Sequence, residues 1–99
     1  MESSLNIDDA AAESVAVAPR VTLESMEAKI EAEQYTVIDS VLTLCIIKMR
    51  NGFYVVGESA PASPANFNAE LGRKFARENA VRKLWGFEGY ALREKLAST

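Results

Sequence analysis

The dipeptide Asn51-Gly52 lies between two runs of strand-forming residues, and no other feature of the sequence restricts the fold as strongly. The first run covers residues 35–49 and the second covers residues 53–58. Asn and Gly both accept the positive φ that a type I′ turn requires, so the pattern predicts a β-hairpin with a two-residue turn. A turn of this length places Lys48 opposite Val55.

Both faces of this hairpin carry apolar side chains. Successive side chains of a strand point in opposite directions. Leu42, Leu44 and Ile46 therefore point to one side, and Val41, Cys45, Ile47 and Met49 to the other. A single covering layer would leave one apolar face in water, so the second face requires a helix or another chain. The polar pair Asp39-Ser40, earlier in the same run, predicts a bend or a bulge.

The segment before the hairpin divides at about residue 20. Residues 1–20 are rich in Ser, Ala and Asp without a sustained period, which predicts a flexible tail. The alternative is a short helix over residues 7–17, which would need a partner to hold it. Thr22 is a good N-cap, and the apolar spacing after it predicts a short amphipathic helix over residues 23–34. Residues 21–99 are expected to form a single α+β domain.

Two helices are predicted after the hairpin. Ser63 is the candidate N-cap and Pro64 the first helical position of a long helix, which is expected to run to about Trp85, where Gly86 ends it. A short helix follows over residues 88–96. The predicted fold class is therefore α+β, with an N-terminal amphipathic helix, a β-hairpin, a long helix and a short C-terminal helix.

The composition limits both the core and the chemistry. A chain of 99 residues with 48% apolar content builds only a modest core, so burial between subunits is attractive and a homo-oligomer is expected. The chain has no histidine, the commonest general base and metal ligand, and the single thiol of Cys45 is expected to be a buried small hydrophobe. We therefore expect no enzyme, no metal and no cofactor. Without an apparent leader or a spanning apolar run, a cytoplasmic protein without membrane partners is indicated.

The long predicted helix carries three stripes when its residues are placed at 100° per step. The large apolar stripe contains Phe67, Leu71, Phe75 and Trp85. A small-residue stripe contains Ala69, Gly72, Ala76 and Ala80. The small stripe is expected to pack tightly on the hairpin, with a subunit interface as the alternative. A charged ladder of Lys74, Glu78 and Arg82 runs along the middle of the large apolar stripe.

This ladder is the candidate binding site. Ion pairs four residues apart contribute only about 0.3–0.5 kcal/mol each, so stability is a poor reason to interrupt an apolar face. The ladder is either an ordinary exposed feature or one wall of a pocket beside aromatic rings. Arginine binds phosphate in a bidentate manner and aromatic faces stack on bases, which suits a nucleotide-like anion. The candidate ligand-binding residues are Arg73, Lys74, Arg77, Glu78, Asn79, Arg82 and Trp85.

Several short motifs resemble those of a known family. They are Asn51-Gly52-Phe53, Gly57-Glu58-Ser59, Ala62-Ser63-Pro64, Gly72-Arg73-Lys74, the stretch from Ala76 to Trp85, and Glu88-Gly89-Tyr90. Over about residues 21–96 the chain resembles the gp49/gp66-like family of small tailed-phage accessory proteins. The resemblance implies an accessory protein that is dispensable for virion structure and acts in the cytoplasm of the bacterial host. Small phage proteins of this kind often counter host defence, some by sequestering nucleotide signals such as cyclic ADP-ribose isomers.

Three functions follow as hypotheses. The first is a non-catalytic homo-oligomer that sequesters a nucleotide-type immune signal in a pocket formed by the basic helix. The second is a protein-interaction module that docks on a host enzyme through the exposed hairpin face, joined by the acidic tail, and inhibits it. The third is nucleic-acid binding by the same helix, which the net charge of −3 disfavours.

Overall fold

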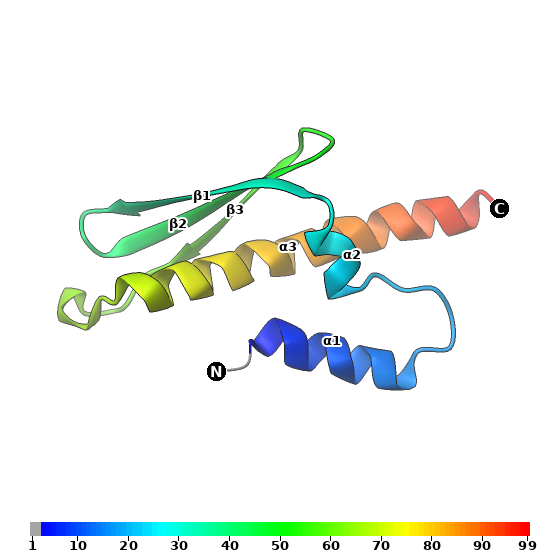
Figure 1. The fold of residues 1–99 in the computed structure, drawn as a ribbon, viewed down its shortest axis with the longest axis horizontal. Helices are drawn as coiled ribbons and strands as arrows, with labels where there is room; N and C mark the ends of the chain where they lie inside the picture. Colours follow the sequence, from blue (N-terminus) through cyan, green and yellow to red (C-terminus); the bar gives the residue numbers. More distant parts are fainter. Residues whose placement is uncertain (1–2) are drawn as a thin grey trace.

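A three-stranded antiparallel sheet lies along one long helix in the computed structural model, which describes residues 3–99 (Figure 1). The elements are α1 (Ser4–Val15), α2 (Leu23–Glu27), β1 (Ile30–Ile38), β2 (Leu42–Met49), β3 (Tyr54–Ser59), the 3₁₀ turn η1 (Pro64–Asn66) and α3 (Ala69–Ala97). The strand order is β1-β2-β3. α3 covers one face of the sheet, and α1 lies on the side of α3 away from the sheet (Figure 1). The predicted α+β class is confirmed.

The first predicted strand is in fact two strands. Asp39 and Ser40 have φ values of 54° and 57°. The backbone N–H of Val41 donates to the carbonyl oxygen of Ile38 at 3.1 Å. The polar pair therefore forms a tight turn between β1 and β2, where only a bend or bulge was expected. A short polar residue such as Asp tolerates the left-handed region better than most residues do, which permits the turn.

The turn at Asn51-Gly52 is present, but its loop is longer than predicted. The loop covers residues 50–52, and its glycine has a φ of 90°. This is the three-residue type of hairpin loop that ends in a left-handed residue. The predicted register is consequently wrong by one residue. Lys48 lies opposite Tyr54 rather than opposite Val55.

The amphipathic helix predicted over residues 23–34 is correct only for its first turn and a half. α2 begins as expected, because Thr22 and Ser25 form a capping box. The chain then enters β1 at Ile30, so residues 30–34 form a strand and not a helix. The nine residues of β1 run along β2, and this pairing outweighs the helix preference of the Glu, Ala and Gln side chains. Strand pairing has overridden local propensity here.

α3 is one helix of 29 residues where two helices were predicted. Gly86 does not end it, because a glycine inside a helix costs only about 1 kcal/mol relative to alanine. The continued helix places Glu88 at 2.6 Å from Lys29. At the other end the N-cap is Asn68, whose side chain accepts a backbone N–H of the first turn. The predicted cap at Ser63-Pro64 instead begins the 3₁₀ turn η1.

The N-terminal segment forms α1, so the structure shows the helix that was the alternative to an unstructured tail. The side chain of Ser3 caps this helix, and Leu5 is 2% exposed and belongs to the core. Arg20, after the helix, pairs with Asp9 at 3.0 Å and with Glu13 at 3.1 Å. The partner that the helix needs is α3 of the same chain. The flexibility of residues 1–20 stays a prediction.

The core lies between the sheet and α3 and depends on small residues. Its buried apolar side chains are Leu5, Leu23, Met26, Cys45, Ile47, Met49, Val55, Ala76, Ala80, Val81 and Leu84. A Cβ at Gly57 would overlap the carbonyl oxygen of Ala76 and the backbone nitrogen of Ala80, so strand and helix backbones are in direct contact. The predicted packing of the small-residue stripe on the hairpin is confirmed for Gly72, Ala76 and Ala80, whereas Ala69 is exposed. Cys45 is fully buried, as predicted.

The other face of the sheet, here called the open face, has no covering element among residues 3–99. It contains Ala32, Gln34, Thr36 and Ile38 of β1, Leu42, Leu44, Ile46 and Lys48 of β2, and Tyr54, Val56 and Glu58 of β3. The predicted alternation of β2 is confirmed, since Thr43, Cys45, Ile47 and Met49 are all buried. Antiparallel sheets normally present polar side chains on their solvated face. The open face instead presents mainly apolar ones.

Candidate functional site

The charged ladder of α3 faces α1. The carboxylate of Glu78 accepts a hydrogen bond from Ser4 Oγ and lies 3.2 Å from Lys74 Nζ. Arg82 donates to Asp8 Oδ2 and to Ser4 Oγ, both at 2.8 Å. The ladder therefore does not extend freely into solvent. Side chains of α1 already bind Glu78 and Arg82, and Lys74 pairs with Glu78.

Glu78 is the centre of this contact. Only 12% of its side chain is exposed. Burial raises the pKa of a carboxyl group, but the hydrogen bond from Ser4 and the charges of Lys74 and Arg82 outweigh burial and lower the pKa of Glu78. The group therefore stays ionised at neutral pH and holds α1 on α3.

Arg77 extends to another side of α3 and joins three elements. Its Nη2 lies 2.8 Å from Glu27 of α2, and its Nε lies 2.9 Å from Glu33 of β1. Burial lowers the pKa of an arginine, yet the two carboxylates more than offset burial and raise the pKa of Arg77. An incoming anion would have to displace two carboxylates to bind this guanidinium.

Asn79 and Lys83 bind the outer edge of β3. Asn79 Oδ1 accepts a hydrogen bond from the backbone N–H of Glu58 at 3.0 Å. Lys83 Nζ donates to the carbonyl oxygen of Val56 at 2.7 Å. These two side chains occupy two of the backbone groups that an edge strand otherwise leaves open. In this structure Asn79 contributes to the sheet edge.

The remaining predicted residues lie apart from one another. Trp85 is partly buried and lines a shallow depression with Arg82, Asp8 and Ala12 of α1. Arg73 is exposed and takes part in none of the ion pairs found among residues 3–99. The seven predicted residues thus share one helix but do not converge on one site.

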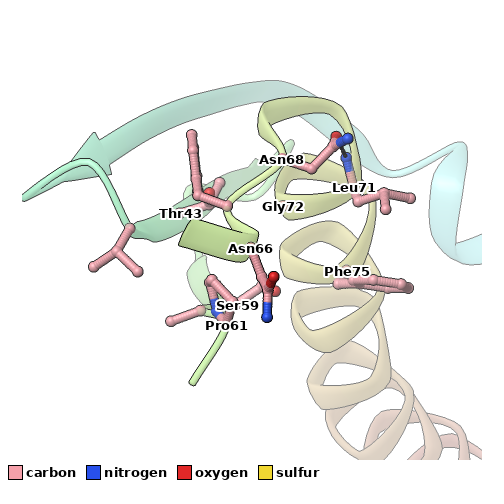
Figure 2. A pocket seen from close by; sticks show the side chains of 11 residues that line it. Thr43, Ser59, Pro61, Asn66, Asn68, Leu71, Gly72 and Phe75 are labelled. Carbon is pink, nitrogen blue, oxygen red and sulfur yellow. Dashed lines mark hydrogen bonds between the residues drawn. The ribbon is translucent and has the colours of Figure 1, made fainter. Parts of the chain in front are cut away.

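A cavity of about 240 Å³ lies at the start of α3, and the sequence did not reveal it (Figure 2). Its walls come from the beginning of β2, the end of β3, the loop with η1, and the first two turns of α3. The lining residues are Val41, Thr43, Ser59, Ala60, Pro61, Asn66, Phe67, Asn68, Leu71, Gly72 and Phe75. The cavity therefore joins segments that are far apart in the chain.

The cavity combines flat apolar groups with polar ones. The ring of Phe75 is 48% exposed, and Lys74 Nζ lies 5.1 Å from its centroid. Asn68, the N-cap of α3, also lines the cavity, so the partially positive end of a 29-residue helix opens beside it. Such a helix end attracts anionic groups, and aromatic rings stack on flat ligands.

Thr43 is the most deeply buried polar residue of the cavity wall. It is 0% exposed, and its Oγ1 has no hydrogen-bond partner among residues 3–99. A Cβ at Gly72 would lie 2.5 Å from this oxygen. Gly72 therefore leaves room for the hydroxyl group, which explains why a glycine stands at this position of the helix.

The sequence contained one signal for this cavity. Asn66, Phe67 and Asn68 join a proline-containing loop to a long helix, and an amide-aromatic-amide run at a helix start can place both groups beside the helix end. Among the predicted residues, Arg73 and Lys74 directly follow the cavity residue Gly72. None of the seven predicted residues lines the cavity itself.

Comparison with known proteins identifies the family. A family model described as "Phage protein (N4 Gp49/phage Sf6 gene 66) family" matches residues 21–96, which include α2, the sheet and nearly all of α3. α1 lies N-terminal to the matched region. No curated protein and no solved structure matches the chain. No helix within residues 3–99 is both long and apolar enough to cross a membrane. Because the match covers most of the chain and agrees with the resemblance of its motifs, the protein belongs to the Phage protein (N4 Gp49/phage Sf6 gene 66) family.

Proposed function

We propose that this phage protein binds a nucleotide-type small molecule in the cavity at the start of α3 and sequesters it without chemical change. In the host cytoplasm the ligand would be an immune signal, such as a cyclic ADP-ribose isomer, and its removal from solution would counter host defence. One observation carries the proposal: two aromatic rings and the N-terminus of a 29-residue helix meet in a single cavity.

The aromatic rings supply the site for a base. Phe67 and Phe75 both line the cavity, and nearly half of the Phe75 side chain is open to solvent. Stacking of a base on an aromatic side chain contributes about 1–3 kcal/mol, and it tolerates different bases because each has a flat π-face. The amides of Asn66 and Asn68 stand beside these rings and could donate to, or accept from, the edge of the base.

The helix end and two basic residues supply the site for phosphate. The first N–H groups of an α-helix lack intrahelical partners and bind anions. Glu70, also in the first turn, weakens the positive potential there. Arg73 and Lys74 would therefore provide much of the attraction, and Arg73 would do so without losing an ion pair found among residues 3–99. Arg77, Glu78, Asn79 and Arg82 would first have to leave their present partners.

The size of the cavity favours an assembly. Pockets that enclose small ligands usually measure about 300–1,000 Å³, and this cavity measures about 240 Å³. It would hold a base and its ribose, while the rest of a dinucleotide-like ligand would lie at its mouth. We therefore retain the homo-oligomer as part of the proposal.

Calorimetric titration with ADP-ribose, cyclic ADP-ribose isomers and cyclic dinucleotides tests the proposal. We expect saturable binding of at least one of them. Phe75→Leu should weaken that binding about tenfold, because it removes the stacking surface. Phe87→Leu is the matched control, since Phe87 lies on the same helix with 53% exposure but outside the cavity. Absence of heat with every compound would refute the proposal.

A second experiment tests whether Arg73 contributes to binding the phosphate group of the ligand. Arg73→Gln should weaken the same binding several-fold and reduce its dependence on salt, because one positive charge near the helix end is lost. Arg93→Gln removes the same charge from an exposed position near the C-terminal end of α3 and should leave the binding unchanged. Equal effects of the two variants would show that only the overall charge matters.

The open face supports a second candidate function, docking on a host protein. Tyr54 is 57% exposed, Ile38 42% and Val56 38%, so apolar side chains of both outer strands meet solvent on one surface. Contiguous exposed apolar patches often mark protein interfaces. Affinity purification from infected cells separates the two functions. A stoichiometric host protein that is lost with Ile46→Lys but retained with Phe75→Leu would favour docking.

A further inference from the structure

We propose that β1 is a self-association edge: it pairs antiparallel with β1 of a second copy and joins two three-stranded sheets into one of six strands. This inference rests on the proposed function only in that it names the interface of the proposed homo-oligomer. It does not depend on ligand binding, because strand pairing requires no ligand. The structure suggests it through a difference between the two edges of the sheet.

Side chains of α3 occupy part of the outer edge of β3, whereas the outer edge of β1 is open. Asn79 and Lys83 of α3 bind the outward N–H of Glu58 and the outward carbonyl of Val56. Among the hydrogen bonds of residues 3–99, none joins a side chain to the backbone of residues 31–37. Unpaired N–H and C=O groups on an edge strand form a template for another strand.

The sheet register identifies the open backbone groups. In an antiparallel pair, successive residues direct their N–H and C=O groups alternately toward and away from the neighbouring strand. The backbone carbonyl of Val56 points away from β2. Its partner on β2, Ile46, therefore directs its backbone groups toward β1. Gln34 lies opposite Ile46, so the backbone groups of Gln34 point toward β2. The residues of β1 whose backbone N–H and C=O groups point outward are therefore Glu33, Tyr35 and Val37.

β1 has little of the protection that edge strands usually carry. Proteins keep exposed edges short, or place charges, prolines or bulges on them. β1 has nine residues, against a common strand length of about five or six. Its only charges are Glu31 and Glu33, its bulge lies at its first residues, and residues 34–38 are uncharged and exposed. The unprotected half is rich in β-branched and aromatic side chains, which favour strand pairing.

A second copy fits this edge because the charge pattern of β1 is compatible with itself under a two-fold axis. An axis at Gln34 pairs the full length of both strands. It places Glu33 opposite the partner's Tyr35 and Glu31 opposite the partner's Val37, so no like charges face each other. An axis at Tyr35 would oppose Glu31 to the partner's Asp39. An axis at Thr36 would oppose Glu33 to the partner's Asp39. The charges thus select the axis at Gln34.

A charge-swap experiment tests both the edge and the axis. Gln34 lies on the axis, so Gln34→Lys sets two lysines against each other and Gln34→Glu sets two glutamates against each other. Without ligand, sedimentation velocity should find the wild type at about twice the chain mass of 10.8 kDa. Each variant alone should dimerise at least about fivefold more weakly, and an equimolar mixture should recover the dimer. Circular dichroism should show an unchanged fold in both variants.

The other outcomes are also decisive. Glu58→Lys is the control, because it changes a charge on the open face next to the occupied edge, and it should leave the dimer intact. A wild type that remains monomeric at high micromolar concentration overturns the inference. A dimer that Ile46→Lys dissociates but Gln34→Lys does not is a stack of two open faces, and this also overturns it. If Gln34→Lys is monomeric and still binds a nucleotide, the β1 edge forms the dimer and the cavity binds its ligand without it. The two proposals can therefore fail separately.

Discussion

The two sides of α3 are held by different forces. On the sheet side, Gly57 allows the backbone of β3 to contact Ala76 and Ala80, and all three residues are buried. On the α1 side, Arg82 and Asp8 form an ion pair whose side chains are 45% and 54% exposed. Close packing loses much free energy when its shape changes, whereas exposed charge pairs contribute little. The packed side lies within the family match, and α1 lies outside it.

The comparison implies that residues 21–96 form the stable unit and that α1 is a lightly attached addition. Only Leu5 of α1 is buried. Its other contacts include the hydrogen bond from Ser4 to Glu78 and the ion pairs of Asp8 with Arg82 and of Asp9 and Glu13 with Arg20. Substitutions on the two sides of α3 should therefore differ clearly in cost.

The largest loss is expected for Gly57→Ala. The new methyl group would overlap the backbone of α3, so the helix or strand would have to move, and we expect a loss of about 3 kcal/mol or more in the free energy of unfolding by urea. Gly89→Ala is the control on α3. A Cβ there meets no atom within 4 Å, so the change should stabilise the helix by up to about 1 kcal/mol. Equal effects at both glycines would contradict the close packing.

An intermediate loss is expected for Leu5→Ala on the α1 side. Leu5 is as buried as Leu84, but α1 can detach from α3, which limits the loss to the docking energy of the helix. We expect about 2 kcal/mol for Leu5→Ala and about 3–5 kcal/mol for Leu84→Ala in urea unfolding. Deletion of residues 1–16 should cost no more than Leu5→Ala. A larger loss on deletion would mean that α1 is an integral part of the core.

The sequence predicted the parts of the fold that depend on local signals. The alternation of β2 and the glycine turn after it are visible within a few residues, and both are present. The first half of β1 was missed because Glu31, Ala32 and Gln34 favour a helix, and only pairing with β2 makes them a strand. Gly86 was wrongly predicted to end the long helix. A glycine ends a helix only where the backbone adopts a left-handed conformation, and α3 continues through Gly86.

In the candidate site too, local features could be predicted from the sequence and long-range contacts could not. The ladder of Lys74, Glu78 and Arg82 interrupts an apolar stripe, and the sequence left open whether the ladder faces solvent or a pocket. That partner is α1, and it could not be recognised because its contacts with α3 span more than seventy residues of sequence. The cavity was missed for a similar reason, since it requires β2, β3 and α3 to converge.

A smaller effect is expected for Glu78→Gln, and it should depend on pH. The pKa of Glu78 is lower in the folded protein than its ordinary value of 4.5. The carboxylate therefore contributes stability that is fully present above the unfolded pKa and is lost as the pH falls through the folded pKa. At pH 7 the variant should lose about 1 kcal/mol, because Gln replaces a charged hydrogen bond with a weaker neutral one. This difference from the wild type should shrink progressively below pH 4.5, as urea titrations over that range would show.

The smallest effect is expected for the exposed pair between Asp8 and Arg82. A double-mutant cycle with Asp8→Asn and Arg82→Gln should give a coupling energy below about 0.5 kcal/mol, because water and salt screen exposed charges. Raising the salt concentration should reduce it further. The same cycle with Ser4→Ala and Glu78→Gln should give a larger coupling, because Glu78 is nearly enclosed. If the exposed pair instead proved to be the stronger, the charges of the ladder and not the burial of Leu5 would hold α1 in place, and high salt alone should release α1 from α3.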